Sequence, residues 1–282
     1  MQRKSLPLAQ DPDHSTAQIF LLETYRYYAG LMRAAATESG SDAPAGLSLG
    51  GRLFWAGELD EMGRALVVAG NVGGVATLAA TSDADLQRQA LRDGIVDFLV
   101  NSLDEALRIL KNEVRKRGTV AVCVAAPVAA VECEMAERGV RPDILREGLV
   151  RSAEAGASPI ERRRDLGVDP MSVQALVVWR VDRSPVLWLP KLDAIALECL
   201  DSDETIARRW LQRASRYLGR LGQTVHLVWA NRESAARFVE GTRELVDRGG
   251  IAVSGRIEVT SPVGTDLLLF SPPASGSPEP QA

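Results

Sequence analysis

The sequence is poor in the residues that most often bind metals or act as catalytic bases and nucleophiles. Its 282 residues include two histidines, His14 and His226, and three cysteines, Cys123, Cys133 and Cys199. A zinc site built from His and Cys would need nearly all of them, from distant segments, so we predict no metal site. The odd number of cysteines, without a secretory leader, is typical of reduced intracellular thiols and favours a cytoplasmic protein.

Other shortages exclude whole classes of partner. Lys plus Arg number 33 against 37 for Asp plus Glu, a net charge of −4, and aromatic residues make up 5% of the chain. This weakly acidic balance argues against a broad nucleic-acid or anionic-membrane surface. No apolar run approaches the ~20 residues of a membrane span. We therefore expect a globular protein without nucleic-acid or membrane partners, and the sequence leaves a homo-oligomer open.

The chain is instead rich in short apolar runs that alternate with helical patterns. Continuous apolar runs of about four to eight residues are typical of strands buried on both faces of a sheet. Strands are expected at residues 64–70, 95–100, 119–126, 142–145, 224–230 and 251–259, and residues 267–270 close the ordered part. Helices are expected at residues 16–36, 73–91, 103–117, 127–139, 203–218 and 233–248. The alternation predicts an α/β fold, a parallel sheet flanked by helices, with an N-terminal helix and a mid-chain hairpin of residues 173–181 and 186–189.

Changes in composition divide the chain into five parts. They are an N-terminal helical segment (1–56), a first α/β half (57–150), a divergent connecting segment with the hairpin (151–202), a second α/β half (203–270) and a tail (271–282). The tail is rich in Pro, Ser and Gly and is expected to be disordered.

The most informative segment is a glycine-containing turn after the expected strand 64–70. Gly70, Gly73 and Gly74 lie where that strand would pass into the next helix. Glycines at such a turn leave N–H groups free, and the positive end of the helix dipole favours an anion. The spacing differs from the Gly-x-Gly-x-x-Gly of dinucleotide-binding turns, so a tight turn without a ligand is the alternative interpretation.

Other candidate residues have simpler explanations. Cys123 in an apolar strand and Cys133 on the next helix are interpreted as small core residues, because apolar burial raises a thiol pKa. His226 alternates with apolar neighbours and is interpreted as a strand residue rather than a general base. Three arginines near expected strand ends are the best candidates for holding an anion, with surface ion pairs as the alternative: Arg64, Arg141 and Arg256.

Several strings of the sequence, in chain order, resemble the urocanase (urocanate hydratase) family. They are Gly57-Glu-Leu-Asp60, Gly73-Gly74, Leu78-Ala-Ala-Thr81, Leu103-Asp-Glu-Ala-Leu107, Glu137-Arg-Gly-Val-Arg-Pro-Asp143, Arg209-Trp-Leu211, Asn231-Arg-Glu233 and Gly255-Arg256. The similarity runs over residues 57–143 and again over residues 203–256. It implies a Rossmann-like domain with tightly bound NAD⁺, whose nicotinamide acts as an electrophile in the hydration of urocanate, a step of histidine degradation.

The resemblance also implies where the cofactor would lie. Its pyrophosphate would lie against Asn71, Val72, Gly73 and Gly74, directly after Gly70, with Thr77 on the first helical turn. Asn101 would stand where an acidic residue normally holds the adenosine ribose.

The sequence departs from the family at its active site. The segment after Asp143 lacks the family's active-site histidine, and the catalytic cysteine context and the Gly-rich C-terminal segment find no counterpart. Our leading hypothesis is a shortened, divergent urocanase-like protein that holds NAD⁺ or another anionic small molecule or nucleotide at Gly73 and Gly74, without hydratase activity on its own. The alternative is a non-catalytic interaction or regulatory module. We assign no catalytic residue, and a conventional NAD(P) dehydrogenase would need a hydride-transfer base that the sequence does not offer.

Overall fold

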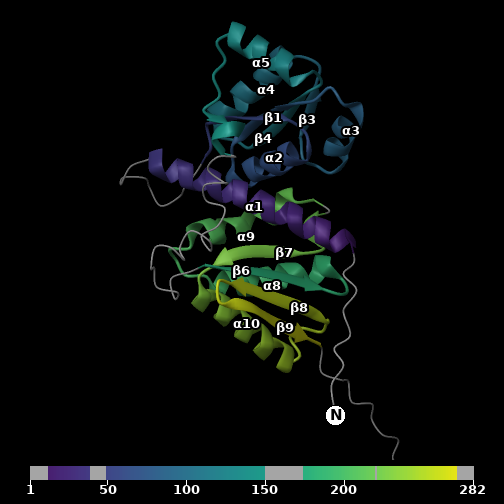
Figure 1. The fold of residues 1–282 in the computed structure, drawn as a ribbon, viewed down its shortest axis with the longest axis vertical. Helices are drawn as coiled ribbons and strands as arrows, with labels where there is room; N and C mark the ends of the chain where they lie inside the picture. The colour runs from purple at the N-terminus through teal and green to yellow at the C-terminus, as the bar shows by residue number, and fades with distance from the viewer. Residues whose placement is uncertain (1–11, 39–48, 150–173, 220, 272–282) are drawn as a thin grey trace, which may run out of the picture.

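The protein has two lobes, each built on one β-sheet, with a long helix between them. The computed structural model describes residues 12–38, 49–149, 174–219 and 221–271. Helix α1 (Pro12–Glu38) crosses between the first lobe (49–149) and the second lobe (174–271), as Figure 1 shows. No helix within these ranges combines the length and the apolar character needed to cross a membrane.

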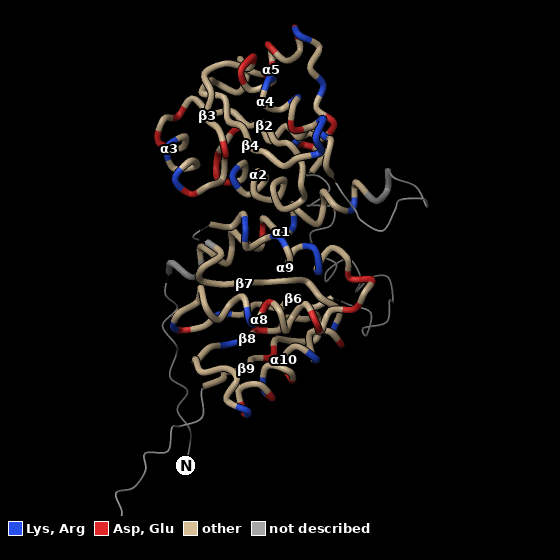
Figure 2. The backbone as a smooth tube through the Cα atoms, turned by 180° about the vertical axis from the view of Figure 1, so that it is seen from behind, with Lys and Arg blue, Asp and Glu red and all other residues tan. Residues whose placement is uncertain are grey.

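The first lobe is an α/β unit with a parallel sheet, as the sequence predicts. Its elements are β1 (Leu53–Glu58), α2 (Glu61–Gly73), β2 (Ala76–Ala80), α3 (Ala84–Arg92), β3 (Phe98–Val100), α4 (Leu103–Lys116), β4 (Val120–Val124), α5 (Val128–Glu137) and β5 (Ile144–Leu145). The strand order is β3-β4-β2-β1-β5, and every pairing is parallel. The central strands β2 and β4 are buried along their whole length and carry no charged residue (Figure 2). They are buried because α4 and α5 cover one face of the sheet and α2 and α3 the other.

The second lobe has an antiparallel sheet. Its elements are β6 (Ala175–Val181), α8 (Pro185–Cys199), α9 (Thr205–Tyr217), the 3₁₀ turn η3 (Leu221–Gln223), β7 (His226–Ala230), α10 (Arg232–Asp247), β8 (Gly255–Ser261) and β9 (Gly264–Phe270). The strand order is β7-β6-β8-β9. Trp179 of β6 packs on Phe238 of α10, with ring centroids 5.1 Å apart, and donates to Asp193 of α8 at 3.1 Å. Helices α8 and α10 therefore cover one face of this sheet.

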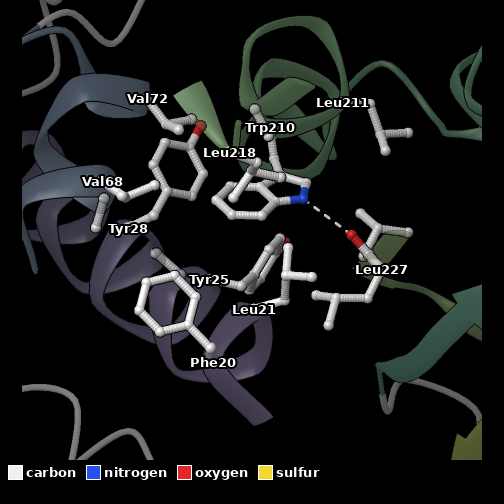
Figure 3. Packing of buried hydrophobic residues seen from close by; sticks show 14 of the residues in the cluster. Phe20, Leu21, Tyr25, Tyr28, Val68, Val72, Trp210, Leu211, Leu218 and Leu227 are labelled. Carbon is white, nitrogen blue, oxygen red and sulfur yellow. Dashed lines mark hydrogen bonds between the residues drawn. The ribbon is translucent and has the colours of Figure 1, made fainter. Parts of the chain in front are cut away.

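Three aromatic side chains join the two lobes (Figure 3). Tyr25 and Tyr28 of α1 pack against Trp210 of α9, with ring centroids 5.0 and 5.3 Å apart. The Trp210 indole N–H donates to the Leu227 carbonyl at 2.9 Å, and Tyr28 also lies beside Val68 of α2. Helix α1 is thus buried within the chain by α2 on one side and by the second lobe on the other.

Two segments were predicted with the wrong type of secondary structure. Residues 64–70 lie inside helix α2, and residues 73–91, expected as one helix, hold the end of α2, strand β2 and most of α3. A helix that is buried all round has no polar face, so its apolar run cannot be distinguished from a buried strand by periodicity. The expected hairpin is also absent, because residues 185–199 form α8, with Pro185 in its first turn, where a missing N–H costs nothing.

Candidate functional site at the carboxyl edge of the parallel sheet

The first strand-to-helix turn of the parallel sheet is the loop between β1 and α2. In open α/β sheets ligands bind outside the carboxyl ends of the strands, and this turn commonly receives a phosphate. Gly57 has a φ of +73°, which favours glycine. A Cβ on Gly63 would lie 1.9 Å from the Glu58 carbonyl oxygen, so only glycine allows this close approach of helix and strand.

The positive end of α2 is already occupied by groups of the protein itself. Asp60 is the N-cap residue, and its Oδ1 accepts from the Gly63 N–H at 2.6 Å. Arg146, which follows β5, donates to Asp60 Oδ2 at 2.9 Å and to the Glu58 carbonyl at 3.0 Å. The Asp60 carboxylate therefore takes the position at which a helix N-terminus would hold a ligand's anionic group.

The residues of this loop do not fit the pyrophosphate of a dinucleotide. Binding would require free N–H groups and no competing negative charge. Here Glu58, Asp60 and Glu61 place three carboxylates in and beside the turn, and Asp60 uses the Gly63 N–H. The guanidinium of Arg146, which could face a phosphate, is held by Asp60 instead.

The glycines predicted to hold the cofactor lie at the opposite edge of the sheet. Gly70 and Gly73 belong to the C-terminal turn of α2, and Gly74 caps it with a φ of 85°. Helix C-termini carry negative partial charge and favour cations. Accordingly, Arg209 of α9 donates to the Gly73 carbonyl at 3.1 Å, and the Arg213 guanidinium would lie 3.3 Å from a Cβ on Gly74. The predicted anion site at a helix N-terminus is thus a cation-capped helix C-terminus.

Comparisons with known proteins decide the family of the first lobe. Residues 28–149 match the family model of the urocanase Rossmann-like domain. This domain belongs to the urocanase family. The chain is 28% identical over 136 residues to the S-methyl thiourocanate hydratase of Variovorax sp. (strain JCM 16519 / RA8). That alignment covers 46% of this chain and about a quarter, 25%, of the relative.

The predicted resemblance is therefore confirmed for the urocanase-type domain. The proposed similarity over residues 203–256, in the second lobe, stays a prediction.

The remaining predicted cofactor residues are dispersed over the urocanase-type domain. Thr77 lies within β2, not on a helical turn, and its hydroxyl finds no hydrogen bond in the described part of the chain. Asn71 and Val72 are buried inside α2, where the Asn71 amide donates to the Ile95 carbonyl at 3.1 Å. Asn101 follows the edge strand β3, three strand positions from β1 and hence about 14 Å away. One ligand cannot use the helix α2 residues and Asn101 in the way the sequence suggests.

The acidic residue after the second strand is Asp83. With β2 as that strand, Asp83 stands where dinucleotide-binding domains hold the ribose. Its Oδ1 instead accepts from the N–H groups of Asp85 and Leu86, at 2.7 and 3.2 Å, and caps α3. The sequence interpretation missed Asp60, Asp83 and Arg146. An Asp directly before a helical pattern is an N-cap signal that marks the first two.

The three candidate arginines are not brought together. Arg64 pairs with Asp93 at 2.7 Å, which agrees with the ion-pair alternative. Arg141 lies on the rim of a cavity of about 480 Å³ beside Trp55, between α5 and β5. Arg256 lies on β8 in the other lobe. They do not form a shared anion site.

The cysteines offer no thiolate. Burial of Cys123 raises its pKa to about 12, which confirms its interpretation as a core residue. Cys133 is exposed, so its assignment to the core was wrong, and a hydrogen bond with Glu137 raises its pKa. The pKa of Cys199 is also raised, mainly by burial. No group of three or more His, Cys, Asp and Glu side chains that could hold a metal occurs in the described ranges.

Proposed function

We propose that this chain is a cytoplasmic, non-catalytic interaction or regulatory module that keeps a urocanase-type Rossmann-like domain without its dinucleotide. One observation carries the proposal: the N-terminus of α2 is capped by Asp60, and Asp60 is bound by Arg146. The Asp60 carboxylate repels a pyrophosphate on this turn. It also supplies the negative charge that the helix N-terminus favours, so no anionic ligand is needed there.

The segment after Asp143 supports the absence of hydratase chemistry. Asp143 accepts from the backbone N–H of Leu53 at 2.7 Å and so fixes the start of β1. Arg146, three residues later, is committed to the β1–α2 loop. These side chains stabilise the sheet edge, and residues 144–149 contain no His, Cys, Ser or Thr. The hydratase activity named for the Variovorax relative is not proposed for this chain, which spans about a quarter of that protein's length.

A second candidate is NAD⁺ or another anionic ligand at Gly73 and Gly74. The observation in its favour is the cationic pair Arg209 and Arg213, whose guanidinium groups lie beside Gly74. Against it, the C-terminus of α2 carries negative partial charge on its last carbonyl groups, which repels an anion. Arg209 already donates to one of them, on Gly73.

Both candidates are tested by the nucleotide content of the purified protein. We expect mass spectrometry of the denatured, as-purified protein to find no stoichiometric NAD⁺, and calorimetry with added NAD⁺ to give no binding heat. Stoichiometric NAD⁺ would overturn the proposal. If NAD⁺ binds, two variants distinguish a site at Gly74 from one at the N-terminus of α2. Arg209→Ala should weaken binding only at Gly74, because Arg209 lies there, whereas Asp60→Ala changes only the α2 N-terminus.

A further inference from the structure

One face of the antiparallel sheet is covered only in part by the described residues. Helices α8 and α10 cover the first face, and α1 reaches the second face at Arg180 of β6, whose Nη2 donates to Gln18 at 2.6 Å. Strands β8 and β9 form the half of the sheet that is farther from α1 (Figure 1). There Leu267 and Leu269 of β9 are 55% and 60% exposed. We call the side chains of β8 and β9 that point to this second face, Leu267 and Leu269 among them, the open face.

The register of the strands places two arginines side by side next to the exposed leucines. Arg180 of β6 lies directly opposite Arg256 of β8, which lies directly opposite Leu269 of β9. In the next row on the same face, Glu258 lies opposite Leu267. Like charges directly opposite each other in a sheet are destabilising, so this arrangement has a cost.

A single carboxylate serves both arginines. Glu258 Oε1 lies 3.9 Å from Arg180 Nη2 and 3.2 Å from Arg256 Nε. Among the described residues two guanidinium groups thus face one carboxylate, which leaves one positive charge unbalanced. The side chains of Arg180 and Arg256 are only 13% and 25% exposed, so water compensates this charge poorly.

The hydrogen bonds of the pair are incomplete as well. The Nε–H of Arg180 is buried and has no acceptor among the described residues, whereas that of Arg256 lies 3.2 Å from Glu258 Oε1 without the alignment of a hydrogen bond. Burial, together with the charge of Arg256, lowers the pKa of Arg180. A buried unpaired donor costs about 1–3 kcal/mol and calls for an explanation, of which a missing anionic partner is one.

We propose that the open face binds an extended segment of a partner protein that carries a carboxylate flanked by apolar residues. The segment pairs with the outer edge of β9, its apolar side chains cover Leu267 and Leu269, and its carboxylate balances Arg256 and Arg180. Such strand addition draws affinity from backbone hydrogen bonds and specificity from alternate side chains. Arg256 lies two strand spacings from the added strand, about 10 Å, which extended Glu and Arg side chains together span.

Charge favours an acidic partner over a second copy of this chain. Two copies meeting through this face would bring two unbalanced positive charges together in a poorly hydrated interface. The nearest acidic residue of β9, Asp266, belongs to the opposite face of the sheet, because it alternates with Leu267. The proposal rests on the interaction role proposed above and names the partner's chemistry.

The direct test uses a synthetic strand and its charge variants. The probe is acetyl-Thr-Val-Thr-Glu-Thr-Val-Thr-amide, which places one Glu between two Val on a single face, titrated into the full chain by calorimetry or NMR. We expect the Gln analogue to bind about tenfold more weakly, the loss of one charged hydrogen bond, and the Lys analogue not to bind. Equal binding of the Glu and Lys peptides, or no binding of the Glu peptide, overturns the proposal.

Variants of the chain supply a second readout. Arg256→Leu leaves Glu258 with Arg180 alone, so we expect it to abolish peptide discrimination and to raise the melting temperature by a few degrees. A purely structural ion pair predicts a lower melting temperature instead, which would contradict the proposal. Arg243→Gln is the matched control, since Arg243 pairs with Glu240 on the exposed side of α10.

Two outcomes separate this surface from its alternatives. A dimer in light scattering that Leu267→Lys converts to monomer means that a second copy covers the face, and overturns the proposal. Bound NAD⁺ in a protein that still binds the Glu peptide overturns the function proposed above and leaves the surface supported.

Discussion

The two sheets of this protein differ in how completely their faces are covered. The parallel sheet of the first lobe is enclosed by helices on both faces, and its central strands are buried throughout. The antiparallel sheet of the second lobe leaves Leu267 and Leu269 exposed on one face. Parallel strands occur almost only with both faces buried, whereas antiparallel sheets tolerate one solvated face. In the urocanase-type domain Asp60 and Arg146 occupy the first strand-to-helix turn, whereas the second lobe exposes two neighbouring leucines on its sheet.

The two faces of the parallel sheet belong to different hydrophobic clusters. The outer face of the parallel sheet packs with α4 and α5 as a separate cluster. The inner face shares one continuous cluster with α1, α9 and the antiparallel sheet. The two lobes thus share their central core, and the predictions below test that sharing.

The largest effect is expected from Trp210→Ala at the junction. Trp210 is 2% exposed and contacts Tyr25 and Tyr28 of α1. Its removal should lower the free energy of unfolding by about 3–5 kcal/mol. Because the core is shared, amide exchange should accelerate in both lobes.

The control for this prediction is Trp188→Ala. Trp188 lies half-buried on α8, and we expect a cost nearer 1 kcal/mol, close to that of an average substitution. Unchanged exchange in the first lobe of the Trp210 variant would mean that the lobes fold independently.

A smaller effect is expected from Gly70→Val within the first lobe. A Cβ at Gly70 would lie 2.6 Å from Thr77 Oγ1 and 3.2 Å from Phe54, so α2 must move away from the sheet. We expect a loss of about 1–3 kcal/mol in denaturant melts without any nucleotide present. Gly30→Ala is the matched helical control, since no atom lies within 4 Å, and should be neutral or stabilising. A Gly70→Val variant as stable as the native chain would contradict the close packing of α2 against Thr77 and Phe54.

A comparable or smaller change in the free energy of unfolding should follow from pH, through the titration of His226 in the second lobe. His226 Nδ1 lies 2.7 Å from Asp193 Oδ1, and Nε2 lies 2.6 Å from the Gly222 carbonyl oxygen. Both partners only accept, so the ring satisfies them as an imidazolium. Burial lowers the pKa of His226, but the bond and charge of Asp193 and the Gly222 carbonyl outweigh it, and the pKa is raised.

The sign of the pH effect follows from that raised pKa. The His226 contribution is fully present below the unfolded value of about 6.5 and is lost as pH rises through the higher folded value. The free energy of unfolding from denaturant melts should fall between about pH 6 and pH 9, by about 1–2 kcal/mol for the charged hydrogen bonds. His226→Gln should flatten this slope, and an equal slope in that variant would contradict the assignment.

The sequence predicted well those elements whose surface is divided between core and solvent. Helices α4 and α9 have one apolar and one charged side, and their observed bounds lie within two residues of the predicted ranges 103–117 and 203–218. Helix α2 failed because its apolar run has no polar side, and with it failed the cofactor site at Gly73 and Gly74. Once α2 was taken as a strand, β1 went unrecognised, and so did the acidic turn after it.

Contacts between distant segments were beyond the sequence for a different reason. The partners Asp60 and Arg146 stand 86 residues apart, and Arg209 and Gly73 stand 136 apart. Periodicity and capping rules describe neighbours within a few turns of chain, whereas these pairs depend on how the lobes and strand ends meet. The pairing of Arg180 with Arg256 likewise depends on strand register, which no local pattern specifies.

The smallest stability effect, and the sharpest test of the closed ligand edge, is expected at Asp60. Asp60→Ala removes the cap of α2 and should cost about 1 kcal/mol. Asp60→Asn keeps a capping side chain while removing its charge, so its stability should stay close to that of the native chain. Both variants remove the negative charge that faces Arg146 and the α2 N-terminus, so an added anion is favoured there.

Inorganic phosphate should therefore raise the melting temperature of Asp60→Asn more than that of the native chain, measured at constant ionic strength. Arg146→Gln in the same background should remove the response. If phosphate acts equally on the native chain and on Asp60→Asn, the Asp60 carboxylate is not what closes the parallel sheet to anions, and the contrast between the two lobes would need another cause.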